Sequence, residues 1–291
     1  VSLNIEQRAR YAEKLAFRKI SSSSLDWGPV LLRLGCAVTL GLSAFGGLPR
    51  HGTTLWTEPT LFVPDMQLSL VIGWDWLATA QYIIAIMLLF GFAIRLASLG
   101  VIGLALIGCV VFGRDFIMHY AFHFIAPALV LLICGAGKLS LDALINWPAL
   151  TLKKPAPKVL WYLIQVMTGM TFVALAVDVK FLQPTLLIAI LDHAKLNFFY
   201  IPTPWVALIM MMIEFLAGAL LALGYLVRPI SLFLLGAMIF FAVALGENPA
   251  LHGNLFGLML FLLAHGGKRF YPGLTVMRFR RLFKIRKLGE L

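Results

Sequence analysis

Charged residues are scarce in this chain of 291 residues, at 13% of the sequence, whereas soluble proteins carry about a quarter. No hydrophilic block is long enough to form a separate soluble domain. Hydrophobic residues make up 61% and the mean hydropathy is +0.92, and several apolar runs reach the roughly 18 residues needed to cross a bilayer. The composition therefore predicts an all-α polytopic membrane protein.

Acidic residues are fewer than basic ones, with 13 Asp and Glu against 24 Lys and Arg, which gives a net charge of +11. This excess does not indicate nucleic-acid binding, because the basic residues gather in 8–19, 153–158 and 268–287, which flank apolar runs. Such flanking Lys and Arg mark the cytoplasmic side of a membrane and favour anionic headgroups. We expect the lipid bilayer, and no nucleic acid, as a partner.

Cysteine is also rare, and Cys36, Cys109 and Cys134 stand alone in apolar runs. Without a C-x-x-C pair, neither a thioredoxin-like site nor a zinc ribbon is indicated, and no metal site is predicted. Residues 1–26 lack the apolar core of a cleavable signal peptide and are expected to form an amphipathic cytoplasmic segment.

Eight membrane spans are predicted, four in each half of the chain, at 28–47, 74–94, 96–112, 116–135, 159–181, 205–227, 229–245 and 251–266. They form two four-helix units, 27–145 and 159–274, joined by a basic, proline-containing linker at 146–158 and followed by a basic tail at 275–291. With both termini inside, only four of the 24 Lys and Arg residues face outward, namely Arg50, Arg114, Lys180 and Lys195. The positive-inside rule therefore predicts two parallel bundles in the inner membrane with cytoplasmic termini.

The two halves share a pattern at an offset of 133 residues, and residues 81–119 align with 214–252 without a gap. Uncommon residues of apolar helices match across this offset, which makes coincidence a poor explanation; the matched pairs are Gln81 with Glu214, Gly91 with Gly224, Arg95 with Arg228, Gly113 with Gly246, and His119 with His252. The sequence therefore predicts a tandem duplication of the four-helix unit.

Ionisable residues within spans are costly and mark candidate sites. Glu214 is preceded by three methionines and an isoleucine, and is predicted either to exchange protons or bind a ligand, or to form a structural pair with Lys180 or His252. Asp178 lies near the same predicted outer boundary. Gln81 is expected at the same depth in the first half.

Three histidines accompany these groups, because His123 follows His119 by one helical turn and His252 is the counterpart of His119. They are expected to donate hydrogen bonds and protons to a quinone, to bind haem or a metal, or simply to join helices. We take Glu214, His252 and His119 as catalytic candidates, and His123, Gln81 and Lys180 as candidates for binding a cofactor.

Other polar and small residues are interpreted structurally. Arg95 and Arg228 each begin a tight turn, and Asp142 is expected to cap a short inner helix. Gly91, Gly103 and Gly113 are expected to allow close helix approach.

The four-helix unit resembles the DoxX/DoxD-like membrane family. The stretch from Glu214 to Arg228, EFLAGALLALGYLVR, is similar to that family's second span, and Gly135 to Asp142, GAGKLSLD, is similar to its closing G-x-G-x-x-S-[LI]-D signature. The second copy lacks the Ser-Leu-Asp, and the first has Gln81 in place of an acid. The resemblance covers most of the chain, once per half.

The resemblance implies a membrane subunit of a redox complex, quinone-linked in the DoxD branch, with quinone a more probable cofactor than haem and other membrane or periplasmic redox proteins as partners. Two other functions are consistent with the residues. A small-solute or ion transporter would use a mid-helix acid at a repeat interface. A non-catalytic scaffold would anchor a larger assembly through its apolar surface.

Overall fold

The computed structural model describes residues 27–46, 61, 73, 75–137, 139–145, 158–193, 200–245 and 248–266. All regular elements within these ranges are helices, which confirms the all-α prediction. The predicted N-terminal segment, most of the linker and the basic tail lie outside the described residues.

In the first half, α3 (Gly28–Phe45), α4 (Trp76–Phe90) and α5 (Ile94–Phe116) are followed by a π-helical turn, η2 (Ile117–Ala121), which continues into α6 (Phe122–Cys134) and the short α7 (Leu141–Leu144). In the second half, α8 (Lys158–Ala174) continues into a second π-helical turn, η3 (Leu175–Phe181). The remaining elements are α9 (Pro184–His193), α10 (Thr203–Leu223), α11 (Val227–Leu245), the 3₁₀ turn η4 (Pro249–His252) and α12 (Gly253–His265).

Four helical stretches are long and apolar enough to cross a bilayer, at Gly28–Phe45, Ile94–Cys134, Thr203–Leu223 and Val227–Ala244. Shorter apolar helices cover Trp76–Phe90, Tyr162–Asp178 and Pro249–His265. The 41-residue stretch is not one straight helix, because Gly113 inside α5 has non-helical angles (φ 63°, ψ −137°) and separates the main part of α5 from its last turn, η2 and α6. These apolar helices are those of an α-helical membrane protein.

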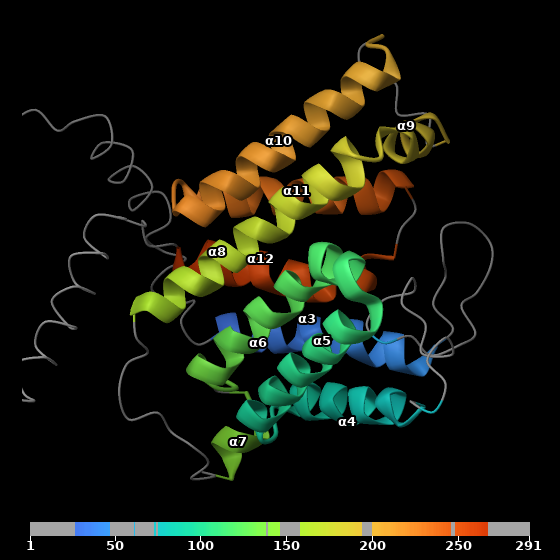
Figure 1. Ribbon diagram of the computed structural model, residues 1–291. Coiled ribbons are helices and arrows are strands. Elements are labelled where there is room, and N and C mark those ends of the chain that lie inside the picture. The colour runs from blue at the N-terminus through green and yellow to red at the C-terminus, as the bar shows by residue number, and fades with distance from the viewer. Residues whose placement is uncertain are drawn as a thin grey trace, which may run out of the picture.

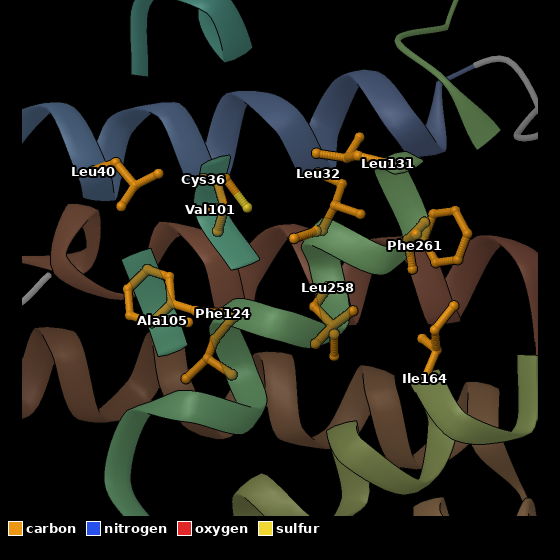
Figure 2. Close-up of a cluster of buried hydrophobic side chains, with 14 of the residues drawn as sticks. Leu32, Cys36, Leu40, Val101, Ala105, Phe124, Leu131, Ile164, Leu258 and Phe261 are labelled. Atoms are coloured by element: carbon orange, nitrogen blue, oxygen red, sulfur yellow. The ribbon is translucent and has the colours of Figure 1, made fainter. Parts of the chain in front are cut away.

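The helices lie side by side, with α4 and α10 at opposite edges of the stack in Figure 1 and α3, α6, α8 and α12 between them. The first helix of each half packs against the last helix of the other, because α3 contacts α12 and α8 contacts α6. Leucine, isoleucine and phenylalanine side chains from these helices form the centre of the core, including Leu32, Phe124, Leu131, Ile164, Leu258 and Phe261 (Figure 2). The two halves therefore share one core.

Glycines bring the backbones of α3 and α12 close together. A Cβ added at Gly253 would lie 2.6 Å from the carbonyl oxygen of Gly35, and one at Gly257 would lie 2.9 Å from Cα of Leu32. Small residues at such contacts are the usual way for membrane helices to associate, because lipid provides no hydrophobic drive. The expectation of close packing at Gly103 is wrong, since no atom lies within 4 Å of a Cβ there, and Gly113 serves as a break between helices.

The helix ends at α4 and α10 are built alike. Gly91 and Gly224 both end their helices in the left-handed conformation, with φ 64° and 76°. The N–H groups of Phe92 and Tyr225 bond to carbonyls five residues earlier, which is the Schellman arrangement. These turns begin 133 positions apart, at the offset that the sequence pattern uses.

The stretch from Gly135 to Asp142 contacts the end of α4 and the start of α5. Ser140 caps α7 by accepting the N–H of Ala143, whereas Asp142 accepts the N–H groups of Ala93 and Ile94 at 2.7 and 2.9 Å, at the start of α5. The expectation that Asp142 caps the short helix is therefore wrong, because its carboxylate lies against a different helix N-terminus.

Buried Arg33 adds to these contacts by donating to carbonyl groups at the end of α4 and after α6, namely those of Leu88, Leu89, Ala136 and Leu139. In the second half, Gln165 donates to the carbonyl of Ala222 at the end of α10, and Arg228 donates to Leu263 and Ala264 at the end of α12. The structural interpretation of Arg228 is confirmed by these contacts. Side chains thus supply the partners that carbonyl groups lack at helix C-termini.

Candidate functional site

Asp178 is the centre of a polar cluster between the two halves. It lies in η3, which packs against η2, and its side chain is only 7% exposed. One carboxylate oxygen accepts from His119 Nε2 at 2.8 Å, and the other forms an ion pair with Arg114. One buried anion is thereby shared by two cationic or potentially cationic groups from the first half.

The local backbone explains why these side chains meet. Gly113 turns the chain sharply within α5, so Arg114 lies in the last turn of α5 before η2, and His119 lies within η2. Both η2 and η3 are π-helical, and such wide turns within α-helices are frequent at functional sites. The guanidinium of Arg114 is 63% exposed and the His119 side chain 22%, so the carboxylate is covered while its partners reach the surface.

A second, deeper cluster begins at His123, which is 4% exposed. Its Nε2 lies 2.9 Å from the carbonyl oxygen of His119, and its Nδ1 lies 2.7 Å from Nδ2 of Asn254 in α12. The same Nδ2 also lies 3.0 Å from the carbonyl oxygen of His123. Asn254 is completely buried, and its Oδ1 has no hydrogen-bond partner.

Thr39 joins this second cluster to α3. Its hydroxyl accepts the backbone N–H of Asn254 at 3.2 Å and lies within hydrogen-bond distance of the carbonyl oxygens of Gly35 and Ala250. This contact is possible because the glycines described above bring α3 and α12 together. Hydrogen bonds therefore lead from Arg114 through both clusters to α3.

Glu214 forms an ion pair with Lys180, one of the two partners considered from the sequence. The side chains are 15% and 24% exposed, and they join α10 to η3 within the second half. Asp178 and Lys180 stand two residues apart in η3, and each pairs with a different half of the chain. Of the two partners that the sequence left open for Glu214, Lys180 and His252, the structure selects Lys180.

The other two candidate residues lie in different surroundings. Gln81 is fully buried in α4, where Nε2 donates to the carbonyl oxygen of Leu40 at 3.0 Å and Oε1 has no partner. His252 ends η4, and its ring interacts electrostatically with His123. The structure therefore brings His119, His123 and His252 together, and leaves Gln81 and Glu214 in separate contacts.

An aromatic row runs beside the histidines. Phe112 stacks on Phe116, Phe116 contacts Tyr120, and Tyr120 lies between His119 and His123 with ring centroids 6.0 and 5.6 Å away. Phe116 is fully buried, whereas Tyr120 is partly exposed. The exposed part of His119 is therefore bordered by aromatic surface.

Sequence reasoning missed three members of these clusters as site residues, namely Arg114, Asn254 and Thr39. Asp178 carried a usable signal, because an acid at the edge of an apolar run requires a partner. Asn254 and Thr39 carried none, because single Asn and Thr residues are ordinary in helices and their partners lie more than a hundred positions away.

Among the described residues, no group of three or more His, Cys, Asp or Glu side chains is arranged to hold a metal ion. Comparison with protein-family models, with curated proteins and with solved structures gave no match to this chain.

Proposed function

We propose that this chain is a DoxX/DoxD-like membrane subunit of a redox complex, in which His119 and Asp178 exchange a proton with a quinone headgroup at the outer leaflet. The proposal rests on one observation, the hydrogen bond between His119 Nε2 and the buried carboxylate of Asp178 at 2.8 Å. A histidine backed by a carboxylate is a common general acid and base, because the carboxylate orients the ring and stabilises its protonated form.

The surroundings of His119 suit a quinone. The headgroup of a quinone is a flat ring with two carbonyl oxygens, and it binds best between apolar or aromatic side chains with a hydrogen-bond donor in reach. Tyr120, which is partly exposed, supplies aromatic surface beside His119, whose side chain is 22% exposed, and buried Phe116 packs behind Tyr120. The donor and the apolar wall are thus next to each other.

A bound quinone would accept two electrons from a partner redox protein, together with two protons. In our proposal Nδ1 of the protonated His119 ring would donate one proton to a carbonyl oxygen, because Nε2 faces Asp178, and the ring would be reprotonated from the outer aqueous phase and donate the second proton in the same way. Asp178 keeps the imidazole ring oriented and stabilises its positive charge. Arg114 pairs with the same carboxylate.

The other predicted residues have supporting roles in this proposal. His123 contacts the backbone of His119, His252 lies near His123, and the pair of Lys180 with Glu214 fixes the second half of η3 against α10. Gln81 occupies the first-half position that matches Glu214. Because it is hydrogen-bonded to the backbone of α3, it would not take part in the quinone site.

We further propose the membrane arrangement that these roles require. The eight helices α3, α4, α5, α6, α8, α10, α11 and α12 would each cross the inner membrane, with both termini in the cytoplasm and two duplicated four-helix units side by side. Support comes from the matching Schellman turns of α4 and α10 and from the reciprocal contacts of α3 with α12 and α6 with α8. The partner would be a membrane or periplasmic redox protein.

Quinone content and quinone binding test the proposal directly. The purified protein in lipid nanodiscs is extracted and analysed for quinone, and binding of a short-chain quinone is followed by quenching of tryptophan fluorescence. His119→Gln and Asp178→Asn should weaken binding about tenfold or more, because a hydrogen bond to a charged group contributes about 1.5–3 kcal/mol. His265→Gln is the matched control, because His265 stacks on Phe261 at the C-terminal end of α12, whereas the polar cluster of Asn254 lies at the N-terminal end of that helix. Absence of quinone together with unmeasurable binding would refute the proposal.

A small-solute or ion transporter is the second candidate. One observation favours it, because the polar clusters of Asp178 and Asn254 lie where helices of the two halves meet, as transport sites between repeats do. Solute uptake into proteoliposomes that is abolished by Asp178→Asn, in protein that binds no quinone, would support transport. A protein that is inactive in both assays but required for assembly of a larger complex would be a scaffold.

A further inference from the structure

We propose that Asn254 is a positioning residue that acts through His123 to hold the turn carrying His119 against Asp178. This inference rests on the proposed function only in taking His119 as the group that exchanges a proton. Its structural content concerns which atoms donate hydrogen bonds in the buried cluster, and that content is testable without any quinone.

The orientation of the Asn254 carboxamide follows from its neighbours. One of its terminal atoms lies 3.0 Å from the backbone carbonyl oxygen of His123, and a carbonyl oxygen can only accept. The atom at this position must therefore be the nitrogen Nδ2, which donates. The oxygen Oδ1 then points to a buried place where it finds no hydrogen-bond partner.

The protonation of His123 follows from that orientation. Nδ2 lies 2.7 Å from His123 Nδ1, and because Nδ2 only donates, Nδ1 must be an acceptor without a proton. On the other side of the ring, Nε2 lies 2.9 Å from the carbonyl oxygen of His119 and must carry a proton. Two backbone carbonyl groups thus define His123 as a neutral imidazole with its proton on Nε2.

His123 in turn fixes the backbone of His119. The carbonyl group of His119 belongs to the π-helical turn η2, where backbone bonding follows a wider spacing than in an α-helix. His123 binds that carbonyl, while the ring of His119 binds Asp178. The same residue is therefore held through its backbone on one side and through its side chain on the other.

Asn254 is itself fixed firmly enough to serve as the anchor. It is fully buried, its backbone N–H donates to Thr39, and Gly253 before it contacts the backbone of Gly35. A buried oxygen without a partner costs about 1–3 kcal/mol, so an apolar residue here would avoid a penalty. The two hydrogen bonds donated by Nδ2 to His123 offset that penalty and explain why an amide occupies the position.

Nitrogen NMR of histidine-labelled protein in nanodiscs tests the proposal, since protonated and bare ring nitrogens resonate far apart. Resonances of His119 and His123 are assigned by their loss in His119→Gln and His123→Gln. In the unaltered protein, His123 should show a protonated Nε2 and a bare, hydrogen-bonded Nδ1. In Asn254→Ala, the Nδ1 resonance of His123 should move from its hydrogen-bonded position, because its donor is gone. Each ring-nitrogen resonance of His119 should split or broaden, because the turn that carries His119 is no longer held in one arrangement.

Gln81→Ala is the matched control, because Gln81 is also a fully buried carboxamide that donates to α3 and leaves its oxygen without a partner. Loss of the Gln81 side chain should leave both histidine spectra unchanged at a similar loss of stability. If Asn254→Ala does not fold, the similarly sized Asn254→Leu provides the test, because its side chain fills the same space and cannot donate to Nδ1.

Three results would overturn the inference. They are a proton on His123 Nδ1 in the unaltered protein, an Asn254→Ala variant whose His119 signal is unchanged, and a Gln81→Ala variant that disturbs His119 equally. The spectra are recorded without quinone, so failure of this inference and failure of the proposed quinone chemistry give different results. A displaced Nδ1 resonance in protein that binds no quinone would support Asn254 as an anchor and refute the quinone role alone.

Discussion

The effects of replacing Lys180 and Glu214 on the free energy of unfolding should depend strongly on each other, because the two side chains form an ion pair. The two side chains are 24% and 15% exposed, so each is largely removed from water when its partner is absent. Removing one partner of a buried pair costs 3–5 kcal/mol, and the partial exposure here places the expected loss near the lower end, at about 3 kcal/mol. Lys180→Met or Glu214→Leu alone should therefore lower the folding equilibrium constant roughly a hundredfold.

The double variant is the decisive measurement. When both charges are replaced by apolar side chains, no unpaired charge remains, and the double variant should be close to the unaltered protein in stability. Unfolding in mixed micelles followed by circular dichroism gives the four free energies of the cycle, and two single losses of about 3 kcal/mol with a near-neutral double variant correspond to a coupling of about 6 kcal/mol. The exposed hydrogen bond from Thr203 to Asp192 serves as a control, where loss of Asp192 should cost less than about 1 kcal/mol. Single losses below about 1 kcal/mol that simply add in the double variant would refute the reasoning.

Three further outcomes are expected. Asp142→Ala should destabilise by about 1–3 kcal/mol in the same unfolding assay, because two N–H groups at the start of α5 lose their acceptor; an unchanged midpoint would contradict the contacts described for it. Gly257→Ala should cost about 1–3 kcal/mol by forcing α12 away from α3, whereas Gly103→Ala, where space is open, should be neutral or stabilising by up to about 1 kcal/mol; equal effects would refute the close approach. In a cysteine-free background, Tyr200→Cys should react with an impermeant maleimide from outside and Leu144→Cys only after the membrane is opened; the reverse order would refute the proposed orientation.

The positions of the helices could be read from the sequence because each is a continuous apolar run with a glycine, proline or charged boundary. The expected end of the third segment at Phe112 anticipates the break that Gly113 makes, and the first segment begins at Gly28 in both accounts. Apolar length and helix-breaking residues are local properties, so one sequence contains them. Whether all eight helices cross the membrane stays a prediction.

The partners of the polar residues could not be read in the same way. His123 and Asn254 are 131 positions apart and meet only because glycines bring α12 against α3. Asp142 illustrates the same limit, because its residue type indicated a cap but only the packing of α7 against α5 decides which helix it caps. The pairing of Lys180 with Glu214 was one of two alternatives, and geometry selects between them.

The two matched histidines occupy helical turns of different width, since His119 lies in the wide π turn η2 and His252 ends the narrow 3₁₀ turn η4. Under the proposed duplication, both turns descend from one ancestral turn, yet they have kept the same residue spacing and changed the path of the backbone. The turn η2 has Asp178 opposite it, whereas its counterpart η4 begins at Pro249. At these matched positions the histidine is the same, and the winding of the backbone that carries it is different.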